Sequence, residues 1–558
     1  MTPYATMRHY SSPSYRGKVA FLVLLTLATF FFHTGALPTD IMEMRNMVTA
    51  REMVEDGAWM VPTMNGELRL EKPPLPTWIA AVIWQACPDS LAVERVAPGA
   101  MGAMMTFFLF LIARNLSRRE DFPFYTCAVF LTCYNVVLMG RSATWDIYCH
   151  AFMMGAIYLL WRALRERGSQ WWRFVGAGVL MGLSFLSKGP VSFYALLLPA
   201  VVAMAVDGGL SLRGKVKPFL LMIIVMIVVG GWWYAWLWLL HSDALRAVAH
   251  KESGSWVNHN VRPWYYYWRF FLEMGVWALM ILAALLAGWW RRHNALKREY
   301  VFSVTWVLAS LVLLSLMPEK KMRYLLPMMP ACAMAVACVL VQLKEIGKRN
   351  KILLWAFRIT CLLVMVLCVA LLPSLLFSPL GEKILNHWTI WAGLFLLWLP
   401  ALLMCFAIRF TRPSALVMGV SLVFILAEAF LLPCIGIAFG NPDAHSVSLI
   451  RQDARLKGKP LYYDLNNPEG LRIELVYAAG RKIRPLNLRD SSAVMMALPC
   501  GILTRQRGEK AISPSLNGQI KITHIGWFDD NRHPRTDRHY NPAFINCITL
   551  LERKPLAP

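Results

Sequence analysis

The stretch Pro218–Leu240, PFLLMIIVMIVVGGWWYAWLWLL, contains no charged side chain. A helix needs roughly 20 apolar residues to cross the hydrocarbon core of a bilayer. This stretch therefore predicts a transmembrane helix. Further apolar stretches bring the expected number of transmembrane helices to about thirteen, near residues 19–36, 95–113, 123–140, 147–161, 173–187, 190–206, 218–240, 268–290, 301–317, 324–343, 352–377, 388–408 and 414–438.

The composition of the whole chain agrees with this interpretation. Of the 558 residues, 57% are hydrophobic and only 16% are charged. A soluble domain of this length does not have such a composition, so the chain is predicted to be a polytopic α-helical membrane protein. The net charge of +24 does not indicate a nucleic-acid partner, because an excess of Lys and Arg in membrane proteins usually marks the cytoplasmic loops.

The position of the basic loops predicts the orientation. If the N-terminus is cytoplasmic, loops such as RNLSRRED (114–121) and KEIGKRNK (344–351) all fall on the cytoplasmic side. The opposite loops contain fewer cations and most of the carboxylates, as the positive-inside rule requires. We therefore expect a multi-pass membrane protein with the C-terminus on the outer side of the membrane.

The sequence changes character after the last apolar stretch. Residues 441–558 are polar, and they contain strand-like pieces (PLYYDL, GILTR, IKITHIGWF and FINCITLL) with a helix-like piece, EGLRIELVYAAG, among them. This pattern predicts a small α/β domain on the outer face, after a transmembrane domain over residues 1–440. Cys500 and Cys547 are the two cysteines in this segment, so one disulfide is conceivable there.

The first outer loop, residues 37–94, is predicted to contain amphipathic helices at the membrane surface. Thr39-Asp40 is a plausible helix N-cap, and apolar residues follow at helical spacing. Asp40 and Glu43 place two carboxylates at the membrane–water boundary, where they are candidates for catalysis. The alternative is simple capping, because carboxylates favour a helix N-terminus.

The same loop ends in LEKPPLPTWIAAVIWQ, in which a Glu-Lys pair precedes two prolines. Pro73 and Pro74 stop a helix, and Pro76 can begin the next one. The break presents Glu71 and Lys72 on irregular backbone. Lys72 suits a phosphate group, and Glu71 suits a metal ion or the orientation of Lys72. The alternative is a polar loop at the membrane interface.

Two later outer loops carry single charges beside apolar stretches. Asp146, in GRSATWDIYCHAF, lies at the mouth of a predicted span, where an ionisable group is costly and is a functional candidate. His150 follows four residues later, on the same helical face. Lys188, in FLSKGPVSF, lies between two apolar spans. The alternatives are a carboxylate and a lysine that extend to water.

Two further outer segments are rich in cations and aromatic residues. One segment contains His259, Arg262 and the aromatic block 264–268, which alone would be an ordinary interfacial anchor. The other segment, LMPEKKMRYLLPMMP, concentrates positive charge on the side where it is under-represented; its candidates are Lys320, Lys321, Arg323 and Tyr324. Such cations can clamp a phosphate. Together, the outer loops predict one membrane-level cavity for an anionic lipid headgroup.

Four of these segments resemble a known family, in the family's order. They are AREMVEDGAWMVPTMNGELRLEKPPLPTWIAA (50–81), ATWDIYCHAFMMGAIYLL (143–160), LMGLSFLSKGPVSFYALLLP (180–199) and EKKMRYLLPMMP (319–330). They resemble segments of the bacterial 4-amino-4-deoxy-L-arabinose (aminoarabinose) lipid A transferases, which group with the protein O-mannosyltransferase-like GT-C glycosyltransferases. The resemblance covers about residues 15–345 and implies a GT-C fold in the bacterial inner membrane, with the outer face periplasmic.

The resemblance also implies a reaction. The sugar is carried on undecaprenyl phosphate, and the acceptor, a lipid A phosphate in the leading case, attacks the anomeric carbon with inversion. The lipid phosphate then leaves. Membrane lipids and the lipid-linked donor are therefore the expected partners. No cofactor is certain, and a divalent metal held by Glu71 and His259 is one implied possibility.

The resemblance assigns roles to the candidate residues. The catalytic carboxylates are Asp40 or Glu43 in the first loop and Asp146. In the family an Asp-Glu pair is adjacent, whereas here TDIMEMR separates Asp40 from Glu43. The donor phosphate is expected to lie against a set of basic residues and one tyrosine: Arg45, Lys72, Lys188, Arg262, Lys320, Lys321, Arg323 and Tyr324.

Two other functions remain open at this point. The acceptor can be a protein hydroxyl or another glycan, in which case a general base becomes essential. The chain can also be a lipid or polysaccharide transporter. Transporters tend to show internal repeats and charges at the membrane midplane, whereas the charges here cluster at one surface. An enzyme is therefore the favoured interpretation.

Overall fold

A computed structural model describes residues 13–286, 296–346, 350–434, 436, 440–441, 443–467, 470–516 and 518–554. The chain forms two compact units. The first consists of Met1–Leu37, Leu70–Pro76 and Leu91–Cys434, and the second of Pro38–Arg69, Thr77–Ser90 and Ile435–Pro558. Most of the first outer loop is therefore grouped with the C-terminal segment.

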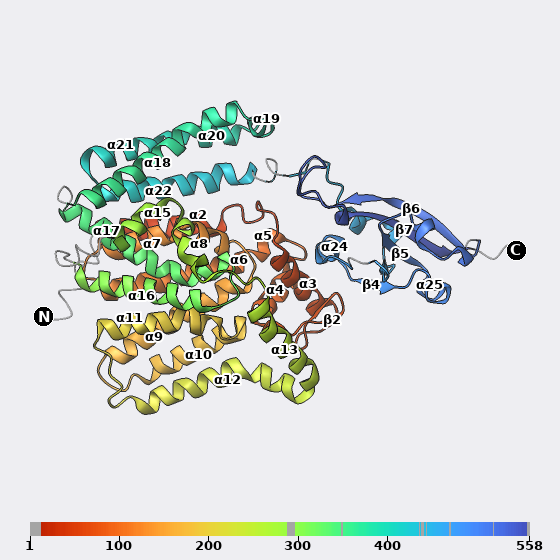
Figure 1. Cartoon of the computed structure of the whole chain (residues 1–558), viewed down its shortest axis with the longest axis horizontal. Coiled ribbons are helices and arrows are strands. Elements are labelled where there is room, and N and C mark those ends of the chain that lie inside the picture. The colour runs from red at the N-terminus through yellow and green to blue at the C-terminus, as the bar shows by residue number, and fades with distance from the viewer. Residues whose placement is uncertain are drawn as a thin grey trace. The chain divides into compact units, whose positions relative to one another are not determined.

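The first unit is helical (Figure 1). Its elements in chain order are α2 (Pro13–Phe31), α5 (Leu91–Glu94), α6 (Val96–Leu116), α7 (Asp121–Leu131), α8 (Tyr134–Gly140), α9 (Trp145–Arg165), α10 (Trp171–Lys188), η1 (Phe193–Leu197), α11 (Leu198–Asp207), α12 (Val216–Leu240), α13 (Ser242–Asn258), η2 (Trp264–Arg269), α14 (Phe270–Glu273), η3 (Gly275–Trp277), α15 (Ala278–Leu286), α16 (Lys297–Leu316), η5 (Met322–Met328), α17 (Met329–Ile346), α18 (Lys351–Leu376), α19 (Pro379–Ile384), α20 (Trp388–Leu396), α21 (Trp398–Phe410), α22 (Pro413–Leu426), η6 (Ala427–Leu431) and η7 (Leu432–Cys434).

Within the described residues, eight helices are long and apolar enough to cross a membrane, or ten if each of two bent helix pairs counts as one span. The eight are Leu91–Leu116, Trp145–Arg165, Val216–Leu240, Lys297–Leu316, Met322–Lys344, Lys351–Leu376, Trp388–Phe410 and Pro413–Cys434. The bent pairs break at Thr132–Cys133 and Met274. The predicted polytopic helical architecture agrees with this count, and the number thirteen stays a prediction.

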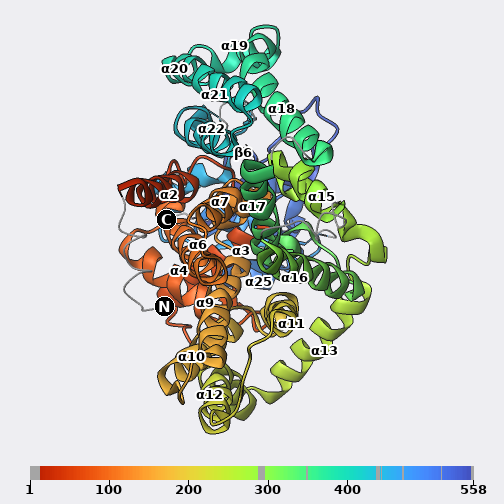
Figure 2. The same cartoon turned by 90° about the vertical axis from the view of Figure 1, so that its left-hand side faces the viewer.

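Small residues allow the helices around α10 to pack closely. In Figures 1 and 2, α10 lies beside α9 and α12. A Cβ atom added at Gly178 would lie 2.5 Å from the carbonyl oxygen of Met222, and one added at Gly182 would lie 2.6 Å from Val229 Cβ. Because lipid tails are as apolar as Leu side chains, close packing of this kind is a main source of attraction between membrane helices. The glycines thus fix the position of α10, whose last residue is Lys188.

The second unit combines helices from the first outer loop with an α/β fold. Its elements are α3 (Ile41–Glu55), β1 (Thr63–Met64), β2 (Glu67–Leu68), most of α4 (Leu75–Ala86), η8 (Val447–Gln452), η9 (Ala454–Leu456), β3 (Leu461–Asp464), α24 (Ile473–Ala479), β4 (Ile483–Leu486), α25 (Ser491–Ala497), β5 (Cys500–Thr504), α26 (Gly508–Ala511), η10 (Pro514–Leu516), β6 (Ile520–Asp529), η11 (Pro542–Phe544) and β7 (Ile545–Arg553).

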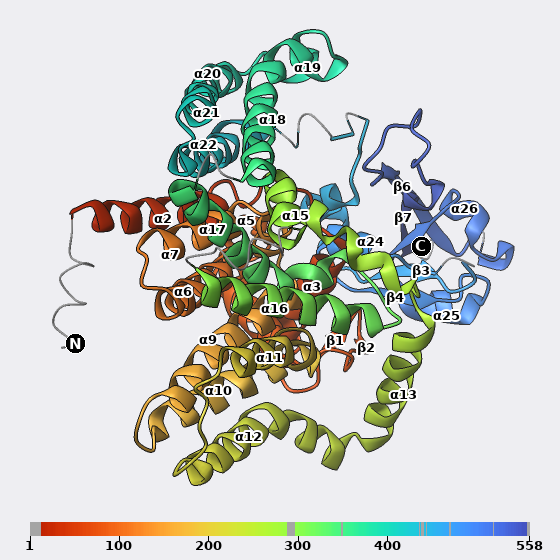
Figure 3. The same cartoon turned by 60° about the vertical axis from the view of Figure 1, so that its left-hand side comes forward.

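The sheet has the order β4-β3-β5-β7-β6 (Figure 3). Strand β3 is parallel to both β4 and β5, whereas β7 is antiparallel to β5 and β6. The four predicted strands and the predicted helix α24 are present. Strand β4 was not predicted from the sequence, because Pro485 interrupts a strand pattern. Proline is tolerated here because β4 is an edge strand.

The two tail cysteines lie on neighbouring strands but do not pair. Cys547 is in register with Thr504, whereas Cys500 is in register with Leu551 at the other end of the same pair of strands. Both thiols are free and buried. The conceivable disulfide is therefore absent, because the strand register holds the two cysteines apart.

Candidate functional site

The centre of the candidate site in the first unit is a buried salt bridge. Asp146 lies in the first turn of α9, and its carboxylate accepts a hydrogen bond from Lys188 Nζ at the end of α10. The two side chains are 3% and 8% exposed. Arg323 Nε lies 3.9 Å from the second carboxylate oxygen of Asp146. The sequence-predicted residues Asp146, Lys188 and Arg323 are therefore brought together.

Gly189 ends α10 directly after Lys188. Its φ of +68° and ψ of −148° lie in a region that residues with a side chain rarely adopt. The chain can therefore turn sharply into Pro190 after presenting Lys188 to Asp146. The Lys-Gly-Pro sequence is the local reason for this geometry.

A second group of charges surrounds Glu319. Lys321 Nζ lies 2.5 Å from Glu319 Oε1, and Tyr324 donates a hydrogen bond of 3.2 Å to Oε2. Burial raises the pKa of Glu319, but the hydrogen bond and charge of Lys321, with Tyr324 and His259, outweigh it and leave the pKa below its usual value. Glu319 is thus held as a carboxylate.

Tyr324 connects the two groups. Its ring lies 5.1 Å from Lys188 Nζ, 5.8 Å from Lys321 Nζ and 5.7 Å from the Arg323 guanidinium carbon. Cations at such distances are attracted to the electron-rich face of an aromatic ring. One tyrosine therefore gathers three of the predicted phosphate-binding cations.

Backbone contacts hold the segment that contains His259 and Arg262 against the segment that contains Glu319. Val261 and Glu319 form an antiparallel bridge, Lys320 N donates to the Asn260 carbonyl, and Arg262 N donates to the Pro318 carbonyl at 3.3 Å. His259 Nδ1 consequently lies 3.6 Å from Glu319 Oε1.

Lys320 points inward from this bridge and is only 3% exposed. It donates a hydrogen bond to the Met317 carbonyl, and burial lowers its pKa. The Lys320 ammonium therefore bonds the backbone in a buried position, whereas the Lys321 side chain is partly exposed.

A cavity of about 250 Å³ adjoins these groups. Its lining is mostly apolar and includes the polar residues His150, Tyr194, Tyr267, Glu319 and Tyr324. His150 is 1% exposed, and its Nδ1 has no hydrogen-bond partner among the described residues. An apolar cavity beside charged groups matches the chemistry of a lipid phosphate.

Glu71 and Lys72 form two parallel ion pairs with α13. Glu71 Oε1 lies 3.0 Å from Lys251 Nζ, and Lys72 Nζ lies 3.2 Å from Glu252 Oε2. The proline break thus presents both charges to consecutive residues of one helix. Lys251 and Glu252 were not identified from the sequence, although their alternating charge in HKES is the complement of Glu71-Lys72.

Asp40 and Glu43 belong to the second unit, where they form a capping box. Asp40 Oδ1 accepts from Met42 N at 2.6 Å, and Glu43 Oε2 accepts from Asp40 N at 2.9 Å. Glu43 is 1% exposed, whereas Asp40 is exposed and lines an open groove of about 680 Å³ together with Arg532. The capping alternative is therefore realised, and Asp40 remains accessible.

Arg45 follows in α3. Its carbonyl accepts a hydrogen bond from Arg69, and its side chain is half-buried. Arg45 therefore lies in the second unit with Asp40 and Glu43, apart in the chain from the cations described above.

Within the described residues, one group of three side chains has metal-ligand spacing: His533, Asp537 and His539 in the second unit. Glu71 and His259 are not part of such a group. Their carboxylate and imidazole instead face Lys251 and Glu319, so a metal held by these two residues stays a prediction.

Comparisons with known proteins support the resemblance. Residues 71–235 match the family model described as dolichyl-phosphate-mannose-protein mannosyltransferase. The chain is 25% identical over 385 residues to the undecaprenyl phosphate-alpha-4-amino-4-deoxy-L-arabinose arabinosyl transferase of Aeromonas hydrophila, covering 63% of this chain and 66% of that protein. It is 26% identical to the Serratia proteamaculans protein of the same name, covering 60% and 61%. The matches therefore span somewhat less than two thirds of these relatives.

The fold is similar to that of a solved structure. The crystal structure of ArnT from Cupriavidus metallidurans bound to undecaprenyl phosphate superimposes with a TM-score of 0.63 at 14% identity, covering 95% of this chain and 96% of that one. The apo form of the same protein gives the same TM-score. The predicted fold, a polytopic α-helical GT-C fold, is confirmed.

Proposed function

We propose that the chain is an inverting glycosyltransferase that moves a sugar from undecaprenyl phosphate to an acceptor on the periplasmic face of the inner membrane. The leading sugar is 4-amino-4-deoxy-L-arabinose, and the leading acceptor is a lipid A phosphate. The similarity to transferases of that name supports this choice.

The observation that carries the proposal is the excess of positive charge beside the apolar cavity. Among the described residues, Lys188 and Arg323 share the carboxylate of Asp146, and Lys321 is paired with Glu319, whose side chain lines the cavity. A phosphate anion would balance this excess. The adjoining 250 Å³ cavity has the apolar lining that suits the first carbons of a polyprenyl chain.

The proposed reaction needs little covalent participation by the protein. An acceptor oxygen forms a bond to the anomeric carbon of the sugar while the bond from that carbon to the donor phosphate oxygen breaks. The electron pair stays on undecaprenyl phosphate, which leaves. Cations placed beside the departing oxygen stabilise the charge that develops there.

Three of the cations have a proposed position in this reaction. Lys188 and Arg323 are held by Asp146, and Lys321 is held by Glu319, so their charges are in place before the donor binds. Preorganised charges of this kind cost no rearrangement during the reaction. Asp146 and Glu319 therefore act in the proposal as positioning residues.

The first-loop carboxylates have a different proposed role. Asp40 is the accessible carboxylate of the capping box, and we assign it to the acceptor. It would remove the proton of a hydroxyl acceptor or orient a phosphate acceptor that is already ionised. Glu43 is buried and holds the N-cap, so it supports Asp40.

The experiment is mass spectrometry of lipid A from a strain that lacks the gene and is complemented with wild-type chain, with Asp40→Asn or with Lys188→Gln. We expect a pentose-derived mass on lipid A with the wild-type chain and its loss with both variants. Equal amounts of each chain in the membrane fraction are the control. Unmodified lipid A in cells that contain wild-type chain would refute lipid A as the acceptor.

A further inference from the structure

The second unit contains a cavity of about 320 Å³ at one edge of its sheet. Tyr463 and Asp464 at the end of β3 and Leu503 and Thr504 at the end of β5 line it. After β3 the chain continues to β4, on one side of β3, and then to β5, on the opposite side of β3. The cavity therefore lies at the carboxyl ends of parallel strands where the strand order reverses, which is where open α/β sheets bind ligands.

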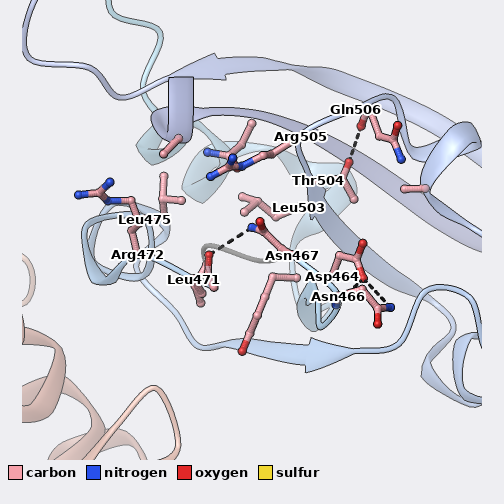
Figure 4. Close-up of a pocket in the computed structure, with 15 residues that line it drawn as sticks. Asp464, Asn466, Asn467, Leu471, Arg472, Leu475, Leu503, Thr504, Arg505 and Gln506 are labelled. Carbon is pink, nitrogen blue, oxygen red and sulfur yellow. Dashed lines mark hydrogen bonds between the residues drawn. The ribbon is translucent and has the colours of Figure 1, made fainter. Parts of the chain in front are cut away.

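Polar side chains converge on this cavity. Figure 4 shows Arg472 and Arg505 on one side of it and Asp464 and Asn466 on the other. Asn466 donates to Asp464 Oδ1 through its backbone N–H at 3.0 Å, which fixes the turn after β3. The arginines come from the start of α24 and the end of β5, so separate elements hold the two sides.

A buried donor on the cavity wall has no partner. Asn546, at the start of β7, is 3% exposed and lines the cavity. Its side-chain Nδ2 forms no hydrogen bond with any described residue. Buried polar groups in folded proteins nearly always have a partner, so this amide on the cavity wall is a donor available to a ligand.

The chemistry of the wall restricts the ligand. Two guanidinium groups favour an anionic group, which an arginine can bind through paired hydrogen bonds. The Arg472 guanidinium lies 4.2 Å from the centroid of the Phe544 ring and 4.0 Å from the carboxylate of Glu474. Asp464, Asn466 and Asn467 offer the mixture of donors and acceptors that adjacent hydroxyl groups require.

We propose that this cavity is a binding site for an anionic saccharide. The phosphate or carboxylate of the sugar faces Arg472, Arg505 and the Asn546 amide, and its hydroxyl groups face Asp464 and Asn466. The residues that line the site all belong to the second unit, and none of them is assigned to the proposed reaction. A free sugar phosphate and the phosphorylated headgroup of a glycolipid share this chemistry.

The test is ligand binding by the full-length chain in detergent, followed by saturation-transfer NMR and by thermal shift. The probes are glucosamine 1-phosphate, glucose and inorganic phosphate, with lipid A in mixed micelles as a fourth arm. We expect saturable binding of the sugar phosphate and much weaker binding of glucose or phosphate alone. Lipid A that competes with the sugar phosphate would identify a lipid headgroup as the source, and lack of competition would identify a soluble one.

Two variants make the test specific. Asn546→Asp keeps the shape of the side chain but replaces the donor by a carboxylate, and Arg505→Gln removes a cation. Each is expected to weaken sugar phosphate binding by about tenfold or more, since charge-assisted hydrogen bonds are the strong ones. Arg484→Gln, an exposed arginine of β4 outside the cavity, is the matched control and should bind like wild type.

The proposal is overturned if no anionic saccharide binds saturably, or if both cavity variants bind as well as the control does. Should Asn546→Asp fail to fold, Arg505→Gln and Arg472→Gln decide the question. The lipid A modification assay separates the two proposals. If the wild-type chain fails to modify lipid A, the proposed acceptor is refuted, whereas the measured binding of the sugar phosphate is unaffected.

Discussion

Asp146 and Lys188 form a buried salt bridge between the beginning of α9 and the end of α10, across 42 residues of sequence. Arg323 approaches the same carboxylate from a third segment of the chain. The Asp146 carboxylate thus holds two cations of the candidate site, Lys188 and Arg323, in position. Variants that remove one charge or both test whether the pair serves activity or only stability.

Lys188→Met should destabilise the chain and abolish transfer. The substitution leaves the Asp146 carboxylate buried with only the more distant Arg323 as a counter-ion, and breaking a buried pair in this way costs about 3 kcal/mol. The double variant Lys188→Met with Asp146→Asn removes both charges and should recover most of the thermal stability. It should remain inactive. Recovery of activity in the double variant would show that Lys188 serves the fold alone.

Lys72→Ala should lower activity strongly with little change in stability. The pairs Lys72–Glu252 and Glu71–Lys251 are both partly exposed, and exposed pairs contribute at most about 1 kcal/mol. The activity loss is expected from the missing donor phosphate contact. Lys251→Ala is the matched control, since it breaks the neighbouring pair, and it should retain activity. Equal losses in both variants would indicate that the α13 contact matters and that Lys72 itself does not.

Asp40→Asn and Asp40→Ala separate capping from chemistry. Asn caps a helix about as well as Asp, whereas Ala costs about 1 kcal/mol. We expect Asp40→Asn to keep the melting temperature of wild type and Asp40→Ala to lower it, with both variants losing transferase activity. A fully active Asp40→Asn variant would mean that Asp40 only caps α3.

Glu319 should make stability depend on pH in the acid range. The pKa of Glu319 in the folded chain lies below its ordinary value, so the unfolded chain binds the proton more readily. The stabilisation is therefore fully present above the ordinary glutamate pKa of about 4.3 and is lost as the pH falls through the lower folded value. Melting temperatures from pH 6 down to pH 3 should drop less steeply in Glu319→Gln. Parallel curves for the two chains would contradict this assignment.

Much of the candidate site followed from single segments of sequence. Asp146, Lys188 and the cations after Glu319 stood out because charge beside an apolar span is costly. Glu319 itself was missed as a member of the site, although it directly precedes the segment that contains four of the predicted residues. The signal was available, because several buried or half-buried cations require a counter-ion.

Other features had no local signal. Asn546 is an ordinary residue in the sequence, and only the cavity and the absent partner make it informative. The bridge between Val261 and Glu319 joins segments far apart in the chain, and nothing in either segment specifies the other.

The sequence by itself determined the class of the protein. Apolar stretches long enough for a bilayer, the distribution of Lys and Arg, and alternating patterns in the tail are local properties, because hydrophobicity and strand pattern depend on neighbouring residues. Tertiary structure alone decided which charges pair. The Lys-Gly-Pro sequence ends α10 locally, but it is the packing of α10 against α9, close at Gly155 and Leu180, that brings Lys188 to Asp146. Pairing of distant charges depends on how helices pack, and packing is a property of the whole fold.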